Sequence, residues 1–327
     1  MNHIFGPVNS RRLGRSLGID LFRYKICNLN CIYCEAGPNV TTTCKRKSYT
    51  PPNVILEELA TFMRDTHKSS EIDTITVTAA GEPTLHADLG FLITELKKMT
   101  GKTIAVLTNG TTLNDEEVRK DLSHADLVIP SLDAAIDKSF RKINRPAIGL
   151  NLRDIISGLN LFCQEFCGQI WLEILFANGI NDHNEDISAL IQALWPIKLK
   201  RIQINTVARP PLEQFAHPLS AERLRAIASQ FSTLPCSPLV ELLSIGQKDC
   251  TPSPYNSSAN QEHTTDHRAL LVRIIDTLQR RPCTANDINR IFHLDNTDKV
   301  DQLLEPLVLS GKLKRQAHHG TLYYQIG

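Results

Sequence analysis

The sequence predicts an α/β protein: a partial parallel (β/α)6 barrel followed by a small C-terminal winged-helix-like domain. Short runs rich in Ile, Val and Leu alternate with helical patterns through the first two thirds of the chain. Most of these runs lack strict polar–apolar alternation, which is typical of parallel strands covered on both faces. A polar segment at 250–266 then interrupts the pattern, and three helical patterns and a hairpin follow it. These observations predict two domains of different architecture.

The expected strands are short apolar runs separated by helical patterns, as in successive βα units. Six units are fewer than the eight that close a full barrel, so we expect an open, partial one. The runs that carry this prediction are 16–22, 72–79, 103–109, 126–132, 170–176 and 201–207.

Helix starts are marked by local signals. Pro51 and Pro52 open one expected helix, because proline is tolerated in the first turn. The range 151–167 has an apolar face at helical spacing, and this face includes Cys163 and Cys167, which we expect to be buried. Two pairs resemble capping boxes: Asn114 with Glu117, and Asp182 with Glu185.

The C-terminal part predicts a separate module. We expect a barrel at 1–235, an extension and flexible linker at 236–266, and a winged-helix-like domain at 267–327. Within that domain, Thr284 and Asp287 resemble a capping pair. The last strands are expected to form a hairpin that turns at His318-His319-Gly320.

Charge is unevenly distributed, although the whole chain carries a formal net charge of only +1. Residues 1–50 contain eight Lys or Arg and two acids, for a net charge of +6. Such a region is expected either to attract phosphate or another anion, or to form a solvated surface. Arg145 and Arg209 each precede a proline, which predicts either rigid arginines that grip an anion or ordinary surface turns.

The expected localisation and the cysteine content limit the roles that the cysteines can have. No apolar run is long enough to span a membrane, and the first residues lack a secretory apolar region, so we expect a cytoplasmic protein without a membrane partner. Nine cysteines in such a chain favour metal binding or redox chemistry over disulfides. Cys44 lies beside Lys45, Arg46 and Lys47, which are expected to lower its pKa.

The densest cysteine cluster is Cys27, Cys31 and Cys34, in "CNLNCIYC". A structural zinc site usually has four ligands, and a ferredoxin-type cluster needs a fourth cysteine, for which Cys44 is a candidate. A third interpretation is an iron–sulfur cube held by three thiolates, with one iron free to bind a small molecule.

This C-x3-C-x2-C spacing, with Tyr33 before the last cysteine, resembles the signature of the radical S-adenosylmethionine (SAM) enzymes. Three further stretches resemble that family's strand-end motifs in order: "AAGEPTL" (79–85), "LTNG" (107–110) and "SLDA" (131–134). The resemblance implies a [4Fe–4S] cluster on the three cysteines. It also implies SAM contacts from Tyr33, Gly81, Glu82, Asn109, Ser131 and Asp133.

The resemblance also implies a reaction. The reduced cluster would cleave SAM to a 5′-deoxyadenosyl radical, which abstracts hydrogen from a substrate, and a reducing protein such as flavodoxin or ferredoxin would supply the electron. "FGPVNSRRLGRSLGID" (5–20) and "RPPLEQ" (209–214) resemble the wyosine-synthase-like iron–sulfur oxidoreductase branch. The expected protein is therefore an enzyme that modifies an unidentified substrate.

Three functional hypotheses remain open from the sequence. The leading one is modification of RNA, since the first 50 residues are basic and a module is appended. A second is an activase that installs a glycyl radical on a partner protein. The third is a winged-helix regulator that uses its cluster as a redox sensor.

Overall fold

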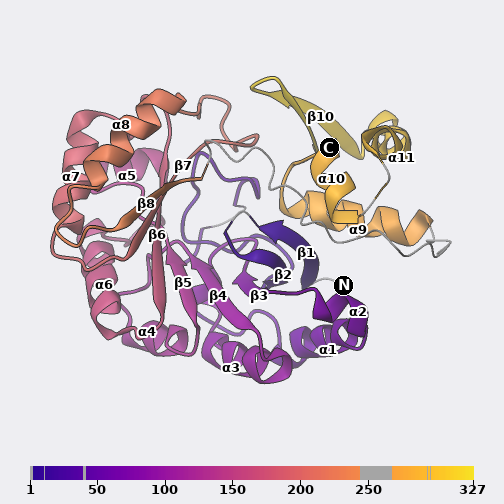
Figure 1. The fold of residues 1–327 in the computed structure, drawn as a ribbon, viewed down its shortest axis with the longest axis horizontal. Coiled ribbons are helices and arrows are strands. Elements are labelled where there is room, and N and C mark those ends of the chain that lie inside the picture. The colour runs from indigo at the N-terminus through magenta and orange to yellow at the C-terminus, as the bar shows by residue number, and fades with distance from the viewer. Residues whose placement is uncertain (1–2, 11, 40–41, 244–266, 293, 295) are drawn as a thin grey trace. The chain divides into compact units, whose positions relative to one another are not determined.

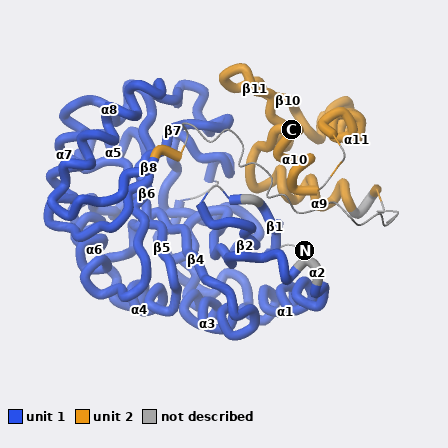
Figure 2. Tube along the Cα trace, viewed as in Figure 1, with its two compact units in different colours: residues 1–241 blue, residues 242–327 orange. Residues whose placement is uncertain are grey.

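A computed structural model describes residues 3–10, 12–39, 42–243, 267–292, 294 and 296–327. The chain divides into two compact units, residues 1–241 and 242–327 (Figure 2). The expected linker at 250–266 lies outside the described residues. In the part of the chain that the structure describes, none of the helices is long and apolar enough to cross a membrane.

The first unit contains an eight-stranded sheet whose strands follow the order of the chain (Figure 1). The strands β2 to β7 correspond to the six expected runs and pair in parallel. This arrangement confirms the predicted α/β partial barrel. Strand bounds are β1 (Ile4–Ser10), β2 (Gly14–Asp20), β3 (Thr74–Thr78), β4 (Thr103–Thr108), β5 (Leu127–Pro130), β6 (Gln169–Phe176), β7 (Arg201–Thr206) and β8 (Leu239–Leu242).

The two edge strands were not among the expected runs. Strand β1 forms an antiparallel hairpin with β2, in which Ile4 lies opposite Ile19 and Ser10 opposite Gly14. Gly6 and Pro7 interrupt the apolar pattern of β1, which hides it from periodicity arguments. Strand β8 has only four residues and lies within the segment expected to be an extension.

Helices follow the strands and lie along the outer side of the sheet (Figure 1). In α1, for example, Ile55, Leu59 and Phe62 are buried, as expected for an amphipathic helix. Helix bounds are α1 (Pro52–Met63), α2 (Thr66–Ser70), α3 (Leu89–Thr100), α4 (Glu116–Leu122), α5 (Asp137–Ile143), α6 (Leu152–Glu165), α7 (Asn184–Leu194) and α8 (Ala221–Phe231), with a short 3-10 turn, η1, at Pro83–Leu85.

Two of the expected capping pairs are wrong. Helix α4 starts one residue later than predicted, so Asp115 caps it by accepting a hydrogen bond from the amide of Glu117. Helix α7 has no side-chain cap, because Asp182 instead accepts from the amide of Gly179 at 2.7 Å within the preceding turn.

The C-terminal end of α6 is also shorter than predicted. The helix ends at Glu165, so Cys167 lies beyond it and is exposed rather than buried. Cys163 is half-buried, and burial raises the pKa of its thiol to about 12.

The turn of the β1–β2 hairpin packs inside the sheet. Leu13 lies against Ala105, Leu127 and Ile129, which belong to β4 and β5. Its neighbour Arg12 donates from Nη1 to Glu173 on β6 (2.6 Å) and Gln203 on β7 (2.8 Å). A partial barrel leaves its interior open, and this turn fills part of it with one apolar and one charged side chain.

The second unit contains helices and a small antiparallel sheet in the order β10-β11-β9. Thr284 and Asp287 exchange two hydrogen bonds of 3.0 Å, which confirms the capping pair. His319 and Gly320 form a two-residue turn with positive φ, as a tight hairpin requires. Element bounds are α9 (His267–Arg280), β9 (Cys283–Thr284), α10 (Ala285–Phe292), α11 (Thr297–Leu309), β10 (Leu313–His318) and β11 (Thr321–Ile326).

This unit has its own apolar core, which includes Ile274, Ile288, Leu304 and Tyr324. Three helices and a hairpin are present as expected. The winged-helix assignment itself stays a prediction.

Candidate functional site

The segment at residues 22–37, here named the three-cysteine loop, crosses the carboxyl end of β3. Ile26 and Gly81 form a parallel bridge, with the Ile26 amide donating to the Ala80 carbonyl at 3.0 Å and the Glu82 amide donating to the Ile26 carbonyl at 2.9 Å. A Cβ on Gly81 would lie 1.8 Å from the Ile26 carbonyl oxygen, and its φ is +149°. Only glycine permits this close approach of two backbones.

A cavity of about 210 Å³ opens beside the loop and the carboxyl ends of β3, β4 and β5. Active sites of parallel barrels are built at this end of the strands. The cavity is lined by eight of the nine residues expected at the site: Cys27, Cys31, Cys34, Tyr33, Gly81, Glu82, Asn109 and Ser131.

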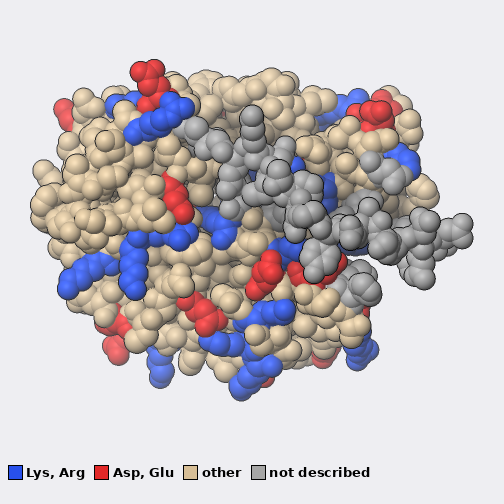
Figure 3. Space-filling model, viewed as in Figure 1, with Lys and Arg blue, Asp and Glu red and all other residues tan. Residues whose placement is uncertain are grey.

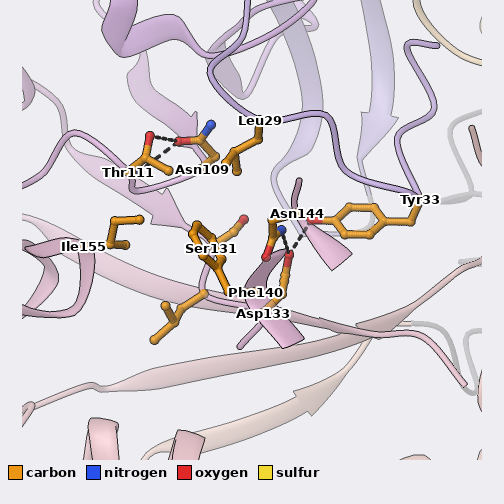
Figure 4. Close-up of a pocket in the computed structure, with 10 residues that line it drawn as sticks. Leu29, Tyr33, Asn109, Thr111, Ser131, Asp133, Phe140, Asn144 and Ile155 are labelled. Carbon is orange, nitrogen blue, oxygen red and sulfur yellow. Dashed lines mark hydrogen bonds between the residues drawn. The ribbon is translucent and has the colours of Figure 1, made fainter. Parts of the chain in front are cut away.

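Asp133, the ninth expected residue, lines a smaller adjoining cavity of about 40 Å³ (Figure 4). Its Oδ2 accepts from the Tyr33 hydroxyl at 2.5 Å and from Asn144 Nδ2 at 2.7 Å, and Oδ1 accepts from the amide of Leu175 at 2.9 Å. Burial raises the pKa of Asp133, while these hydrogen bonds oppose the rise. Asp133 therefore fixes Tyr33, and with it one end of the three-cysteine loop.

Glu82 is almost completely buried, with 1% of its surface exposed. Its Oε1 accepts from the amide and hydroxyl of Thr84 (3.0 and 2.6 Å) and from the Thr108 hydroxyl (2.6 Å). Its Oε2 accepts only from the Asn109 amide, at 2.6 Å, among the hydrogen bonds of the described residues. Burial raises the pKa of Glu82, and the hydrogen bonds act in the opposite direction. The carboxylate is thus held in one orientation at the cavity wall.

Asn109 links the end of β4 to the three-cysteine loop. Its Nδ2 donates to Asn28 Oδ1 at 2.8 Å and lies 3.7 Å from Cys27 Sγ. Asn28 in turn donates to the Thr111 hydroxyl at 2.7 Å. Neither of these two residues was among the expected site residues, although Asn28 lies within "CNLNCIYC" and Thr111 directly follows "LTNG".

The three thiols provide a donor set of the kind that iron–sulfur clusters use. Burial raises the pKa of Cys27 to about 12 and raises that of Cys31 even further. These thiols stay protonated at neutral pH until a metal displaces the proton, as coordination does. Among the described residues, no three His, Cys, Asp or Glu side chains converge on a point that could hold a single metal ion. A cube does not require such convergence, since each thiolate binds a different iron.

The thiol of Cys44 does not have the lowered pKa that the sequence predicted. It is exposed and absent from the lining of the larger cavity, and desolvation raises the pKa of its thiol. The cationic neighbours therefore do not produce the expected lowering.

The arginines that precede prolines are paired with acids of the chain itself. Arg145 donates to Glu213, and Arg209 donates to Glu35 at 3.0 Å. The amide of Glu213 also donates to the carbonyl of Ile32 at 2.9 Å. These contacts fasten the segment after β7 to the three-cysteine loop, so the prediction of anion-gripping arginines is not supported.

Pairing also reduces the positive charge expected of residues 1–50. Arg12 pairs with Glu173, Arg15 with Glu71, and Arg46 with Asp121. On the face shown in Figure 3, Lys and Arg side chains lie among Asp and Glu side chains. Three of the eight cations of residues 1–50 are therefore paired with acids from elsewhere in the chain, so the net positive charge around this region is lower than its composition predicts.

A partial parallel barrel with three thiols and polar strand ends around one cavity defines a class of cluster- and cofactor-binding enzymes. The family model of the radical SAM superfamily matches residues 21–191, slightly more than half of the chain. The chain therefore belongs to the radical SAM superfamily.

Similar proteins have varied names. A protein of Brachyspira hyodysenteriae named GTPase Obg is 35% identical over 99% of this chain, but the match spans only 45% of that protein. A UPF0026 protein of Synechocystis is 38% identical over 64% of this chain and 78% of its own length. A radical SAM methyltransferase structure from Sphaerobacter thermophilus is similar in fold, with a TM-score of 0.53, 15% identity, and 69% of this chain and 66% of that chain covered.

Proposed function

We propose that this chain is a radical SAM enzyme that binds a [4Fe–4S] cluster through Cys27, Cys31 and Cys34. In this proposal SAM binds at the carboxyl ends of β3, β4 and β5. The observation that carries the proposal is the single cavity that contains all three thiols and the strand-end groups Gly81, Glu82, Asn109 and Ser131. Membership of the superfamily supports the same pair of cofactors.

The cluster and SAM together would supply reductive C–S cleavage and a 5′-deoxyadenosyl radical, which are chemistry that side chains alone do not provide. The protein's own part is to bind, orient and exclude water. Gly81 lets the three-cysteine loop lie directly on β3. Glu82 Oε2 accepts one hydrogen bond among the described residues and has a second lone pair, and a carboxylate is a suitable partner for an ammonium group such as that of methionine.

Asn109, Ser131 and Tyr33 complete the wall. Asn109 is fixed by the amide and hydroxyl of Thr111, both of which donate to its Oδ1. Tyr33 is fixed by Asp133. Groups whose orientation is set before binding lose little entropy when a cofactor arrives, so the site is suited to hold SAM in one pose.

We extend the proposal to RNA as the substrate. Arg23 lies in the three-cysteine loop, and Lys45 and Lys47 follow this loop in the chain. All three are exposed, and within the described ranges none of them forms an ion pair with a carboxylate. Unpaired cations next to the site would attract a polyanion. The finer assignment to the wyosine-synthase-like branch is part of this proposal and rests on the sequence resemblance of residues 5–20 and 209–214.

The test is anaerobic reconstitution with iron and sulfide, followed by addition of SAM and dithionite and measurement of 5′-deoxyadenosine. Wild type should form it, whereas Cys27→Ala, Cys31→Ala and Cys34→Ala should not. Cys44→Ala is the matched control and should behave as wild type, because Cys44 lies outside the cavity lining. Total RNA from a deletion strain, added to the assay and digested to nucleosides, should contain one with altered mass.

The enzyme proposal would be contradicted by a wild-type protein with a fully assembled cluster that forms no 5′-deoxyadenosine and whose EPR spectrum does not change when SAM is added. An RNA pool that stays unmodified while 5′-deoxyadenosine forms in response to a protein fraction would contradict only the RNA extension.

A further inference from the structure

Each of the three cysteine sulfurs accepts a hydrogen bond from within this chain. The amide of Leu29 donates to Cys27 Sγ at 3.4 Å. Three side-chain nitrogens also donate to these sulfurs: Asn109 Nδ2 to Cys27 Sγ at 3.7 Å, Asn144 Nδ2 to Cys31 Sγ at 3.4 Å, and Lys25 Nζ to Cys34 Sγ at 3.0 Å. Neither Lys25 nor Asn144 was among the expected site residues, and both have contacts that hold them in place.

Lys25 is half-buried and lies two residues before Cys27. Besides Cys34, its ammonium group donates to the carbonyl of Gly37, at the far end of the three-cysteine loop. Lys25 lines the larger cavity, where a charge is less screened than in bulk water.

Asn144 is 3% exposed and follows the last residue of α5. The main-chain carbonyl oxygen of Asn144 accepts a hydrogen bond from the main-chain amide of Asn30 at 3.0 Å, which ties Asn144 to the three-cysteine loop. The Nδ2 group has two hydrogens, and the contacts to Asp133 (2.7 Å) and Cys31 (3.4 Å) use both. Because Asp133 can only accept when ionised, it fixes the side-chain amide of Asn144 with its nitrogen toward Asp133 (Figure 4). The second hydrogen of that nitrogen is then directed to Cys31 Sγ.

We propose that Lys25 and Asn144 are positioning residues that raise the reduction potential of the cluster bound by the three cysteines. This inference rests on the proposed function. Uptake of one electron, here from dithionite, adds one negative charge to the cluster. A positive charge and a hydrogen-bond donor directed at the thiolates stabilise the more negative, reduced state relative to the oxidised one. Lys25 should have the larger effect, because it supplies both a charge and a donor.

The experiment is a potentiometric titration of the reconstituted full-length protein without SAM, followed by the EPR signal of the reduced cluster. Lys25→Met should shift the midpoint potential to more negative values, and Asn144→Ala should shift it in the same direction by less. Lys25→Arg keeps a charged donor and should remain close to wild type. Lys47→Met is the matched control: Lys47 is an exposed lysine that packs on the Tyr49 ring, and its removal should not change the potential.

The possible outcomes distinguish a failure of this inference from a failure of the proposed function on which it rests. Loaded Lys25→Met and Asn144→Ala proteins with the wild-type potential would overturn the inference alone. If Lys25→Met assembles no cluster, Lys25→Gln takes its place, since it keeps a donor without the charge. The midpoint potential of Lys25→Gln should then be more negative than that of wild type. A wild-type value would overturn the role of the charge. A wild-type protein that binds no cluster would refute the proposed function and this inference with it.

Discussion

The three-cysteine loop and helix α10 are both held by side-chain hydrogen bonds, but the partners of the loop lie far away in the chain. Tyr33 bonds to Asp133 across 100 positions, and Cys31 accepts from Asn144 across 113. In α10, by contrast, Thr284 and Asp287 are three residues apart. Local contacts form as soon as their segment folds, whereas the distant ones require the barrel to be assembled first.

This difference predicts different consequences of mutation. A change in the loop's supports disturbs several strands at once, because each support belongs to a separate βα unit. A change in the α10 cap disturbs one helix of the second unit. We therefore expect the largest losses of stability where the loop meets β3, and the smallest at the cap.

Gly81→Ala should have the largest effect. The new methyl group would lie 1.8 Å from the Ile26 carbonyl oxygen, so the loop would have to move away from β3. We expect the free energy of unfolding to fall by about 3 kcal/mol or more, from overpacking and backbone strain together. Urea titration followed by the fluorescence of Trp171 and Trp195, both in the first unit, would measure it.

Gly37→Ala is the matched control for Gly81→Ala. Gly37 also has positive φ, +75°, but a Cβ there would meet nothing within 4 Å. The strain of the backbone alone predicts a loss of about 1 kcal/mol. Equal losses in the two variants would show that the contact with Ile26 is unimportant.

Asp133→Asn should come next. An amide has one acceptor oxygen where the carboxylate has two, so a donor among Tyr33, Asn144 and the Leu175 amide loses its partner. We expect a loss of about 2 kcal/mol in the free energy of unfolding at pH 7. Asp133→Asn proteins as stable as wild type would mean that Asp133 does not hold the loop.

The same variant tests a pH dependence. Burial raises the pKa of Asp133 above its ordinary 3.8, so the folded state binds this proton more tightly than the unfolded state. The contribution of Asp133 to stability is therefore largest at acidic pH and falls as pH rises through the raised pKa. The difference between wild type and Asp133→Asn should be larger at pH 4.5 than at pH 7; a difference that grows with pH would contradict the raised pKa.

The smallest effect is expected at the α10 cap. Asp287→Ala removes the acceptor of the Thr284 amide, and a cap of this kind contributes about 1 kcal/mol. Hydrogen exchange of the full-length chain should quicken in α10 and leave β3 unchanged. The double variant with Thr284→Ala should lose less than the sum of the two single variants, because the two hydrogen bonds are reciprocal. Faster exchange in β3 would show that the two units are coupled.

Much of the first unit could be predicted because parallel strands buried on both faces are unusually apolar. The runs that became β2 to β7 are of this kind, and their ends carry the groups that line the cavity. The edge strands are different: β1 contains Gly6 and Pro7, and β8 is short and only partly buried. Neither has the composition that marks a central strand.

The residues of the candidate site also divide into those that the sequence could predict and those that it could not. Cysteine spacing and strand-end motifs predicted eight residues that share one cavity. They could not predict Lys25 or Asn144, since an ordinary lysine and an ordinary helix-ending asparagine acquire their roles only through folding. The capping pair at Asn114 was wrong for a related reason: Asn114 and Asp115 are both good caps, and the tertiary structure decides which is used.

Arg12 has a consequence for the order in which the molecule is completed. It is separated from Glu173 by 161 positions and from Gln203 by 191, yet it joins the hairpin turn to β6 and β7. A ribosome delivers the hairpin before these partners. A segment that is made earlier is therefore among the last to find its final contacts, and until β6 and β7 are made the Arg12 side chain lacks both acceptors.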